Sequence, residues 1–139
     1  MTTQQSHVMG RDRVDVSEYA GDDAMLIRQL RDANEHRAGQ SGGFLWFFYR
    51  TPDDDSCVLH AGVRDNRGVL QWFDNDAGNI FLPGGSNVDD VDYFSTFGQH
   101  FPMDPGTEVP IDLALSTVAN FARTGQRPTC VEWQPEAQE

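Results

Sequence analysis

The fold is decided by residues 109–133, VPIDLALSTVANFARTGQRPTCVEW. The apolar residues of this stretch recur at helical spacing and form one broad face: Ile111, Leu113, Ala114, Leu115, Val118, Ala119, Phe121 and Ala122. Pro110 suits a first helical turn, and Gly125 followed by Pro128 ends the helix. Residues 129–133 then predict a short strand. Because a lone helix of this length is unstable in water, its apolar face must cover a sheet.

The sheet is predicted from the middle of the chain. Residues 44–49, FLWFFY, are uninterrupted apolar, which indicates a central strand covered on both faces. Short polar turns separate the strands that follow, which indicates an antiparallel meander. A second helix is predicted from Asp22 to just before Gly39. Residues 98–106, which hold two prolines, are predicted to be a long loop. The remaining strands are predicted at residues 11–16, 56–63, 69–73, 79–82 and 91–97.

These elements predict an α+β fold, with an antiparallel β-sheet of about five or six strands and two α-helices packed on it. The length of 139 residues fits a single domain at residues 11–134, with a flexible tail at residues 1–10 and a second tail at residues 135–139. Cys57 and Cys130 lie in strand-like runs, which favours buried thiols over a disulfide.

The charge of the chain restricts its partners. Twenty-two acidic residues against ten basic ones give a formal net charge of −12. Such a chain repels nucleic acid and anionic membrane surfaces and attracts cationic proteins. The sequence has no apolar run long enough to span a bilayer, and residues 1–9 lack the pattern of a secretory signal. We therefore expect a cytoplasmic protein that binds neither nucleic acid nor membrane.

Motifs of enzymes and metal sites are missing from the sequence. The four histidines are His7, His36, His60 and His100, and none has zinc-ligand spacing to another histidine or cysteine. His100 lies near Asp104 in the sequence, and the two are a candidate acid–base pair. Residues 84–86, GGS, lack the lysine of a phosphate loop, and residues 53–55 lack the spacing of a calcium loop. We expect no catalytic residues, no metal and no cofactor.

Acidic residues gather instead in the predicted turns and loops. If several of these turns share one edge of the sheet, they create a concentrated negative field for a cationic partner. Aromatic residues lie between the acidic residues of the segment from Asp89 to Asp104, and aromatic side chains are common anchors of tight interfaces. Phe94 and Phe97 have a core position as the alternative, since strand alternation sends one of them inward. The predicted contact residues are Asp53, Asp54, Asp55, Asp74, Asp76, Asp89, Asp90, Asp92, Tyr93 and Asp104.

The chain also resembles a known family. Phe101-Pro102, residues 107–110 (TEVP), 121–125 (FARTG) and 131–133 (VEW), together with Arg127-Pro128, resemble the immunity protein 1 family of bacterial polymorphic toxin systems. The hairpin at residues 68–78 and the PGGS at residues 83–86 fit the same pattern. The likeness spans residues 44–133, and the carboxyl-terminal third carries most of it. It implies an α+β fold and protection of a toxin-producing cell, commonly against toxins of the nucleic-acid deaminase superfamily. It implies no catalytic residues and assigns no toxin-contacting positions.

Charge and resemblance together predict an immunity protein that binds one cognate toxin in a 1:1 complex. The toxin is expected to be a nucleic-acid deaminase, and the acidic surface is expected to occlude its basic substrate cleft. Tyr93 is a candidate to enter the toxin's base pocket. One alternative is a small-ligand-binding or enzymatic α+β domain that uses His60 or His100 in a pocket. Another is an adaptor that binds basic protein tails.

Overall fold

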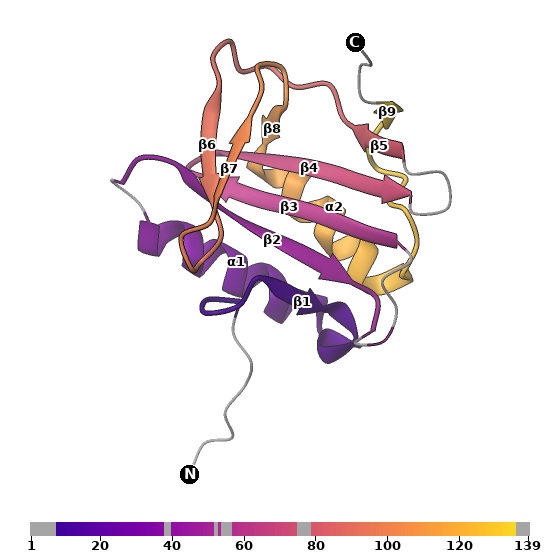
Figure 1. Cartoon of the computed structure of the whole chain (residues 1–139). Coiled ribbons are helices and arrows are strands. Elements are labelled where there is room, and N and C mark those ends of the chain that lie inside the picture. The colour runs from indigo at the N-terminus through magenta and orange to yellow at the C-terminus, as the bar shows by residue number, and fades with distance from the viewer. Residues whose placement is uncertain (1–7, 38–39, 52, 54–56, 75–78, 136–139) are drawn as a thin grey trace.

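The computed structural model describes residues 8–37, 40–51, 53, 57–74 and 79–135. These residues form two layers, a β-sheet and two α-helices that both lie against one face of it (Figure 1). The helices are α1, Asp23–Arg37, and α2, Ile111–Thr124, and a short 3-10 helix, Val16–Tyr19, precedes α1. The strands are β1 (Arg13–Asp15), β2 (Gly43–Tyr49), β3 (Cys57–Arg64), β4 (Arg67–Asp74), β5 (Asn79–Leu82), β6 (Val91–Phe94), β7 (His100–Met103), β8 (Glu108–Pro110) and β9 (Gln134–Pro135).

The predicted meander is confirmed, but the sheet around it is larger than predicted. β2, β3, β4 and β5 pair antiparallel in sequence order. The full order is β7-β6-β2-β3-β4-β5-β9, with β1 paired to β2 and β8 to β4, which makes a nine-stranded sheet. β1 and β6 both run parallel to β2, so the prediction of about five or six purely antiparallel strands is wrong. Parallel pairs join segments that are distant in sequence, and the turn residues that predict a meander carry no signal for them.

The predicted carboxyl-terminal helix is confirmed, whereas the strand predicted after it is wrong. Gly125 ends α2 in the left-handed conformation, with a φ of 68°, and donates its N–H to the Phe121 carbonyl at 2.7 Å. In residues 129–133 the indole Nε1 of Trp133 donates to the Pro128 carbonyl at 2.8 Å, which folds the segment back on itself. Cys130 in this segment is exposed and not buried as predicted, with its Sγ 3.5 Å from the Thr117 hydroxyl. The side chain of Cys57 lies outside the described part of the chain.

The segment predicted as a long loop, residues 98–106, contains strand β7. This strand pairs antiparallel with β6, and Pro102 stands opposite Asp92. Proline is compatible with this position because β7 is at the edge of the sheet, where a missing N–H need not break a ladder bond. The strand predicted at residues 91–97 ends at Phe94, and the chain then turns back toward β7.

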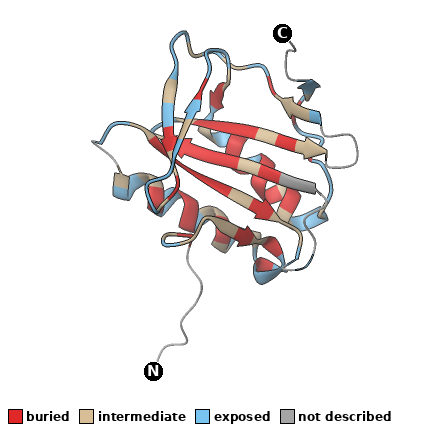
Figure 2. Ribbon diagram, viewed as in Figure 1, coloured by how far each residue is buried: buried red, intermediate tan, exposed pale blue. Residues whose placement is uncertain are grey.

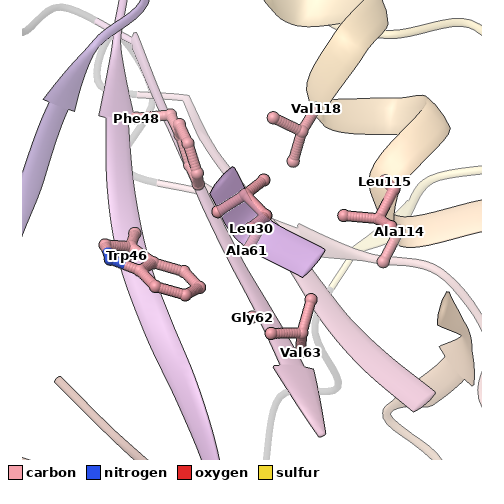
Figure 3. A pocket seen from close by; sticks show the side chains of 9 residues that line it. All are labelled: Leu30, Trp46, Phe48, Ala61, Gly62, Val63, Ala114, Leu115 and Val118. Carbon is pink, nitrogen blue, oxygen red and sulfur yellow. The ribbon is translucent and has the colours of Figure 1, made fainter. Parts of the chain in front are cut away.

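Alternate side chains of β2, β3 and β4 form the main core with the helices (Figure 2). Gly68 allows α2 to approach closely, since a Cβ at that position would lie 2.6 Å from the Cβ of Ala114. The gap that remains between the layers is too narrow to admit a water molecule (Figure 3). The core side chains include Trp46, Phe48, Leu59, Ala61, Val63, Leu70 and Trp72 from the sheet, and Leu26, Leu30, Leu115, Val118 and Phe121 from the helices. This face of the sheet is therefore covered by α1 and α2.

Part of the predicted amino-terminal tail is packed into the domain. Val8 is completely buried, and its carbonyl accepts a hydrogen bond from Nε1 of Trp46 at 2.9 Å. Val8 thus lies inside the fold and not in the tail expected at residues 1–10, of which residues 1–7 lie outside the described part of the chain.

Candidate protein-binding surface

The face of the sheet that the helices leave free carries a projecting hairpin. We call residues 87–107, which contain β6 and β7, the β6–β7 arm. The arm stands across one end of β2, β3 and β4, on the side away from α1 and α2 (Figure 1). Its inner side packs on the sheet through a small second core formed by Leu45, Val69, Tyr93 and Met103, with Phe47, Val91 and Phe101 partly buried around it.

A buried charged cluster fixes the arm to the sheet. Glu108 in β8 is completely buried, and its carboxylate accepts hydrogen bonds from Nε and Nη2 of Arg64 in β3, both at 2.7 Å. The Tyr93 hydroxyl in β6 donates to the same carboxylate at 2.7 Å. The Tyr93 ring lies against Gly43 and Gly62, where a Cβ would come within 2.8 Å and 2.9 Å of it. Three strands are therefore joined at one carboxylate.

The pKa shifts of Glu108, Tyr93 and Arg64 each favour one protonation state near neutral pH. Burial alone raises the pKa of the Glu108 carboxyl, but hydrogen bonds from Arg64 and Tyr93 and the positive charges of Arg64 and Arg67 outweigh it and hold that pKa below its usual value. Burial and the hydrogen bond to Glu108 raise the pKa of the Tyr93 hydroxyl. The hydrogen bond to Glu108 also raises the pKa of the Arg64 guanidinium. Near neutral pH the cluster is therefore an ion pair with a protonated phenol.

Asn87 orders the two loops at the outer end of the arm, by which we mean the end where the chain enters β6 and leaves β7, opposite the β6–β7 turn. Its Oδ1 accepts the backbone N–H groups of Thr107 and Glu108 at 2.8 Å and 2.7 Å. Its Nδ2 donates to the backbone carbonyls of Asp89 and Asp104 at 2.8 Å and 3.1 Å. One side chain thus fixes the segment that enters β6 beside the segment that leaves β7. Gly85 makes room for this contact, because a Cβ there would lie 2.5 Å from the Glu108 nitrogen.

The arm brings together a first group of the predicted acidic residues. Asp89, Asp90, Asp92 and Asp104 are all exposed and lie at or near its outer end; we call these four residues the acidic tip. Oδ1 of Asp92 lies 2.8 Å from Nε2 of His100 on the neighbouring strand. The partner of His100 is therefore Asp92, and the predicted pairing with Asp104 is wrong.

The other predicted acids are not part of the acidic tip. Asp53 is exposed after β2, and Asp74 is half-buried at the end of β4, where it stands opposite Cys57. Asp54, Asp55 and Asp76 lie outside the described residues. The described acids thus lie in two places, the arm and the chain at or after the ends of β2 and β4.

Tyr93 lies inside the fold and not on the exposed side of the arm. Its side chain is completely buried and its hydroxyl is bound to Glu108, so it cannot enter a partner's pocket without disrupting the second core. Alternation in β6 placed its ring on the inner side of the arm. The cluster could not be found from the sequence, because nothing local to Glu108 points to Arg64, which is 44 residues away in the chain.

A row of rings lies on the sheet beside the arm. The ring centroids of Phe101 and Phe47 are 5.5 Å apart, those of Phe47 and His60 are 4.3 Å apart, and those of His60 and Phe73 are 4.2 Å apart. Burial between these rings lowers the pKa of His60 from 6.5 to about 4, against a hydrogen bond to Gln71 that raises it. His60 is therefore a neutral packing residue at pH 7.

Three hollows among the described residues lack the histidines that the small-ligand alternative requires. Neither His60 nor His100 lines the gap in the core or the two open hollows beside α1, of about 450 Å³ and 310 Å³. Among the described residues, no three histidine, cysteine or acidic side chains are grouped as metal ligands.

Replacing Glu108 by glutamine should destabilise the domain by about 2–4 kcal/mol, because the Arg64 charge then loses its buried partner and keeps only partial solvent contact. Chemical denaturation of E108Q beside wild type measures this difference. E132Q, which changes an exposed carboxylate, serves as the control and should stay within about 0.5 kcal/mol of wild type. A wild-type midpoint for E108Q would contradict the role assigned to the cluster.

Replacing His60 by phenylalanine should flatten the loss of stability on acidification. The unfolded state binds the His60 proton below about pH 6.5, whereas the folded state resists it until about pH 4, so wild-type stability falls as the pH drops through this window. Denaturation curves at pH 7 and pH 5 should show wild type losing about 1–2 kcal/mol more than H60F. Equal losses would show that His60 is not buried in its neutral form.

Comparison with known proteins assigns the chain to a family. No described helix is long and apolar enough to cross a membrane. A search of curated proteins found no match. The model of one protein family, described as immunity protein Imm1, matches residues 15–135, from β1 to β9, and so includes the arm, the Glu108 cluster and both helices. The chain therefore belongs to the Imm1 family of immunity proteins.

Proposed function

We propose that this chain neutralises a cognate toxin that is a nucleic-acid deaminase, by placing the acidic tip of the β6–β7 arm over the toxin's basic substrate cleft. Family membership supports the coarser part, the role of an immunity protein in a toxin system. The finer part, the surface and the mechanism, is carried by one observation. The four carboxylates of the acidic tip are exposed together on an arm that projects from the free face of the sheet.

Charge supports the choice of target. Enzymes that act on nucleic acid present basic clefts to the phosphate backbone. The chain has a formal net charge of −12, so its long-range field attracts a basic partner and raises the association rate. The charges of the other acidic residues predicted as contacts, Asp53, Asp54, Asp55, Asp74 and Asp76, contribute to this field as well. The acidic tip supplies the short-range contact.

Preorganisation supports the choice of the arm. Asn87 holds the backbone of Asp89 and Asp104 together, and the Glu108 cluster holds the arm on the sheet. A surface that is ordered before binding loses little conformational entropy in the complex. The acidic tip can therefore bind tightly without a folding step, and affinity in the nanomolar range or tighter is expected for such an interface.

The proposed mechanism is occlusion without chemistry by the immunity protein. A deaminase must admit an unpaired or flipped base to a zinc-bound water. One arm over the cleft entrance blocks the phosphates and the base together, in a 1:1 complex. Since Tyr93 is buried, the blocking contact is made by the exposed side chains of the arm.

Reversing Asp89, Asp90 and Asp92 to lysine should slow association with the toxin about 10–100-fold at low salt, because electrostatic steering toward the basic cleft is lost. The probe is the catalytically inactivated toxin domain encoded beside the immunity gene. Stopped-flow binding at several salt concentrations measures the rate, and the steep salt dependence of wild type should disappear in the variant.

A matched variant separates local from global charge. Asp32, Glu35 and Asp112 are exposed on the two helices, so reversing them changes the net charge equally on the opposite side of the sheet. This control should retain most of the wild-type rate. If the two triple variants slowed association equally, or if neither did, the acidic tip would not be the contact surface.

A further inference from the structure

The β6–β7 arm also presents an exposed aromatic side chain. Phe97 is 70% exposed, in the turn between β6 and β7. Among the described residues, the other large apolar side chain that is strongly exposed is Val88, at 84%. Soluble proteins expose scattered apolar residues routinely, so exposure alone assigns no role to either of them. What distinguishes Phe97 is how its backbone is held.

Ser95 builds a rigid turn beneath Phe97. Ser95 is 2% exposed, and its Oγ accepts the backbone N–H groups of Phe97 at 3.2 Å and Gln99 at 3.1 Å. The backbone closes the same turn, with Ser95 donating to the Gln99 carbonyl and Gly98 donating to the Ser95 carbonyl, both at 2.9 Å. Gly98 takes a φ of 93°, which a side chain would strain. Phe97 is therefore exposed on an ordered turn.

A second set of contacts ties this turn to the start of the domain. The Thr96 hydroxyl donates to the Arg11 carbonyl at 3.2 Å and accepts the Gly10 N–H at 3.2 Å. Thr96 and Gly98, on either side of Phe97, also line the open hollow of about 450 Å³ beside α1. The turn is thus held by the hydrogen bonds of Ser95 within it and of Thr96 to residues 10 and 11, while the Phe97 ring stays in solvent.

We propose that Phe97 is the apolar anchor of the toxin complex, inserting its ring into an apolar pocket on the toxin while the acidic tip covers the basic cleft. This inference rests on the proposed function and adds a second contact to it. Strand β6, Val91–Phe94, carries Asp92 of the acidic tip and leads to the turn of Phe97. It extends roughly 13 Å, so the anchor and the acidic tip fit within one interface of standard size.

The interface chemistry of this pair is complementary. Clustered carboxylates accelerate encounter, whereas a buried aromatic ring slows release. A single phenylalanine loses few rotamers on binding, and its rigid turn loses none of the backbone freedom that an open loop would lose. Aromatic anchors at such positions carry a large part of the affinity in protein complexes.

The test measures binding of F97A to the inactivated toxin domain by surface plasmon resonance. F97A should raise Kd about 30–1,000-fold, mainly through faster dissociation, and should leave the association rate within about threefold. S95A keeps the Phe97 side chain and loosens its turn, so it should raise Kd about 5–20-fold when binding is measured at a temperature where S95A is fully folded. V88A, which shortens the other exposed apolar side chain, should change Kd less than about fivefold.

Three outcomes would overturn the anchor. One is an F97A affinity within about threefold of wild type, and another is an equal loss in V88A and F97A, which would make exposed apolar area the cause. The third is a free-chain dimer, seen by sedimentation and abolished by F97A, with toxin binding unchanged.

If F97A binds normally while the reversal at Asp89, Asp90 and Asp92 still slows association, the anchor fails and the proposed function stands. If the toxin binds none of these proteins, the proposed function itself fails.

Discussion

The arrangement of the free sheet face depends on one buried carboxylate. Glu108 receives a bidentate guanidinium from β3 and a phenol from β6, and its own strand pairs with β4. A carboxylate buried without such partners would be strongly destabilising. The three strands must therefore come together for the charge to be satisfied, and this requirement places the arm in one position over the sheet. The orientation of the acidic tip follows from it.

The two faces of the sheet serve different purposes. One is closed by α1 and α2, which pack on it to form the main core, and the gap between the layers has no room for water. The other is covered only in part, by the β6–β7 arm and its small second core. Because the arm is built from an edge hairpin and two loops, its outer side is free to carry charge and an exposed ring without disturbing the main core. In the proposed function, the toxin contact and the main core therefore lie on opposite sides of the central strands.

Local patterns predicted the elements that local interactions determine. The periodicity of α2, its glycine stop and the antiparallel order of β2, β3, β4 and β5 were all visible in the sequence, and the structure confirms them. β7 was missed because two prolines indicated a loop, although one of them occupies an edge position where proline is tolerated. The strand predicted at residues 129–133 is absent, and the Trp133 indole instead donates a hydrogen bond back to the Pro128 carbonyl. The parallel pairing of β1 and β6 with β2 depends on contacts across the chain that no short pattern encodes.

For the candidate site, the sequence located the acids of the arm but assigned Tyr93 to the surface. The position of Tyr93 is determined by Arg64 and Glu108, which are 44 residues apart in the chain.

Hydrogen–deuterium exchange of this chain, free and bound to the inactivated toxin domain, tests the central claim most directly. If the β6–β7 arm is the contact surface, amides of residues 87–107 should exchange more slowly in the complex, while the exposed sides of α1 and α2 remain unchanged. Protection confined to the helices, with the arm exchanging as it does in the free protein, would contradict the account.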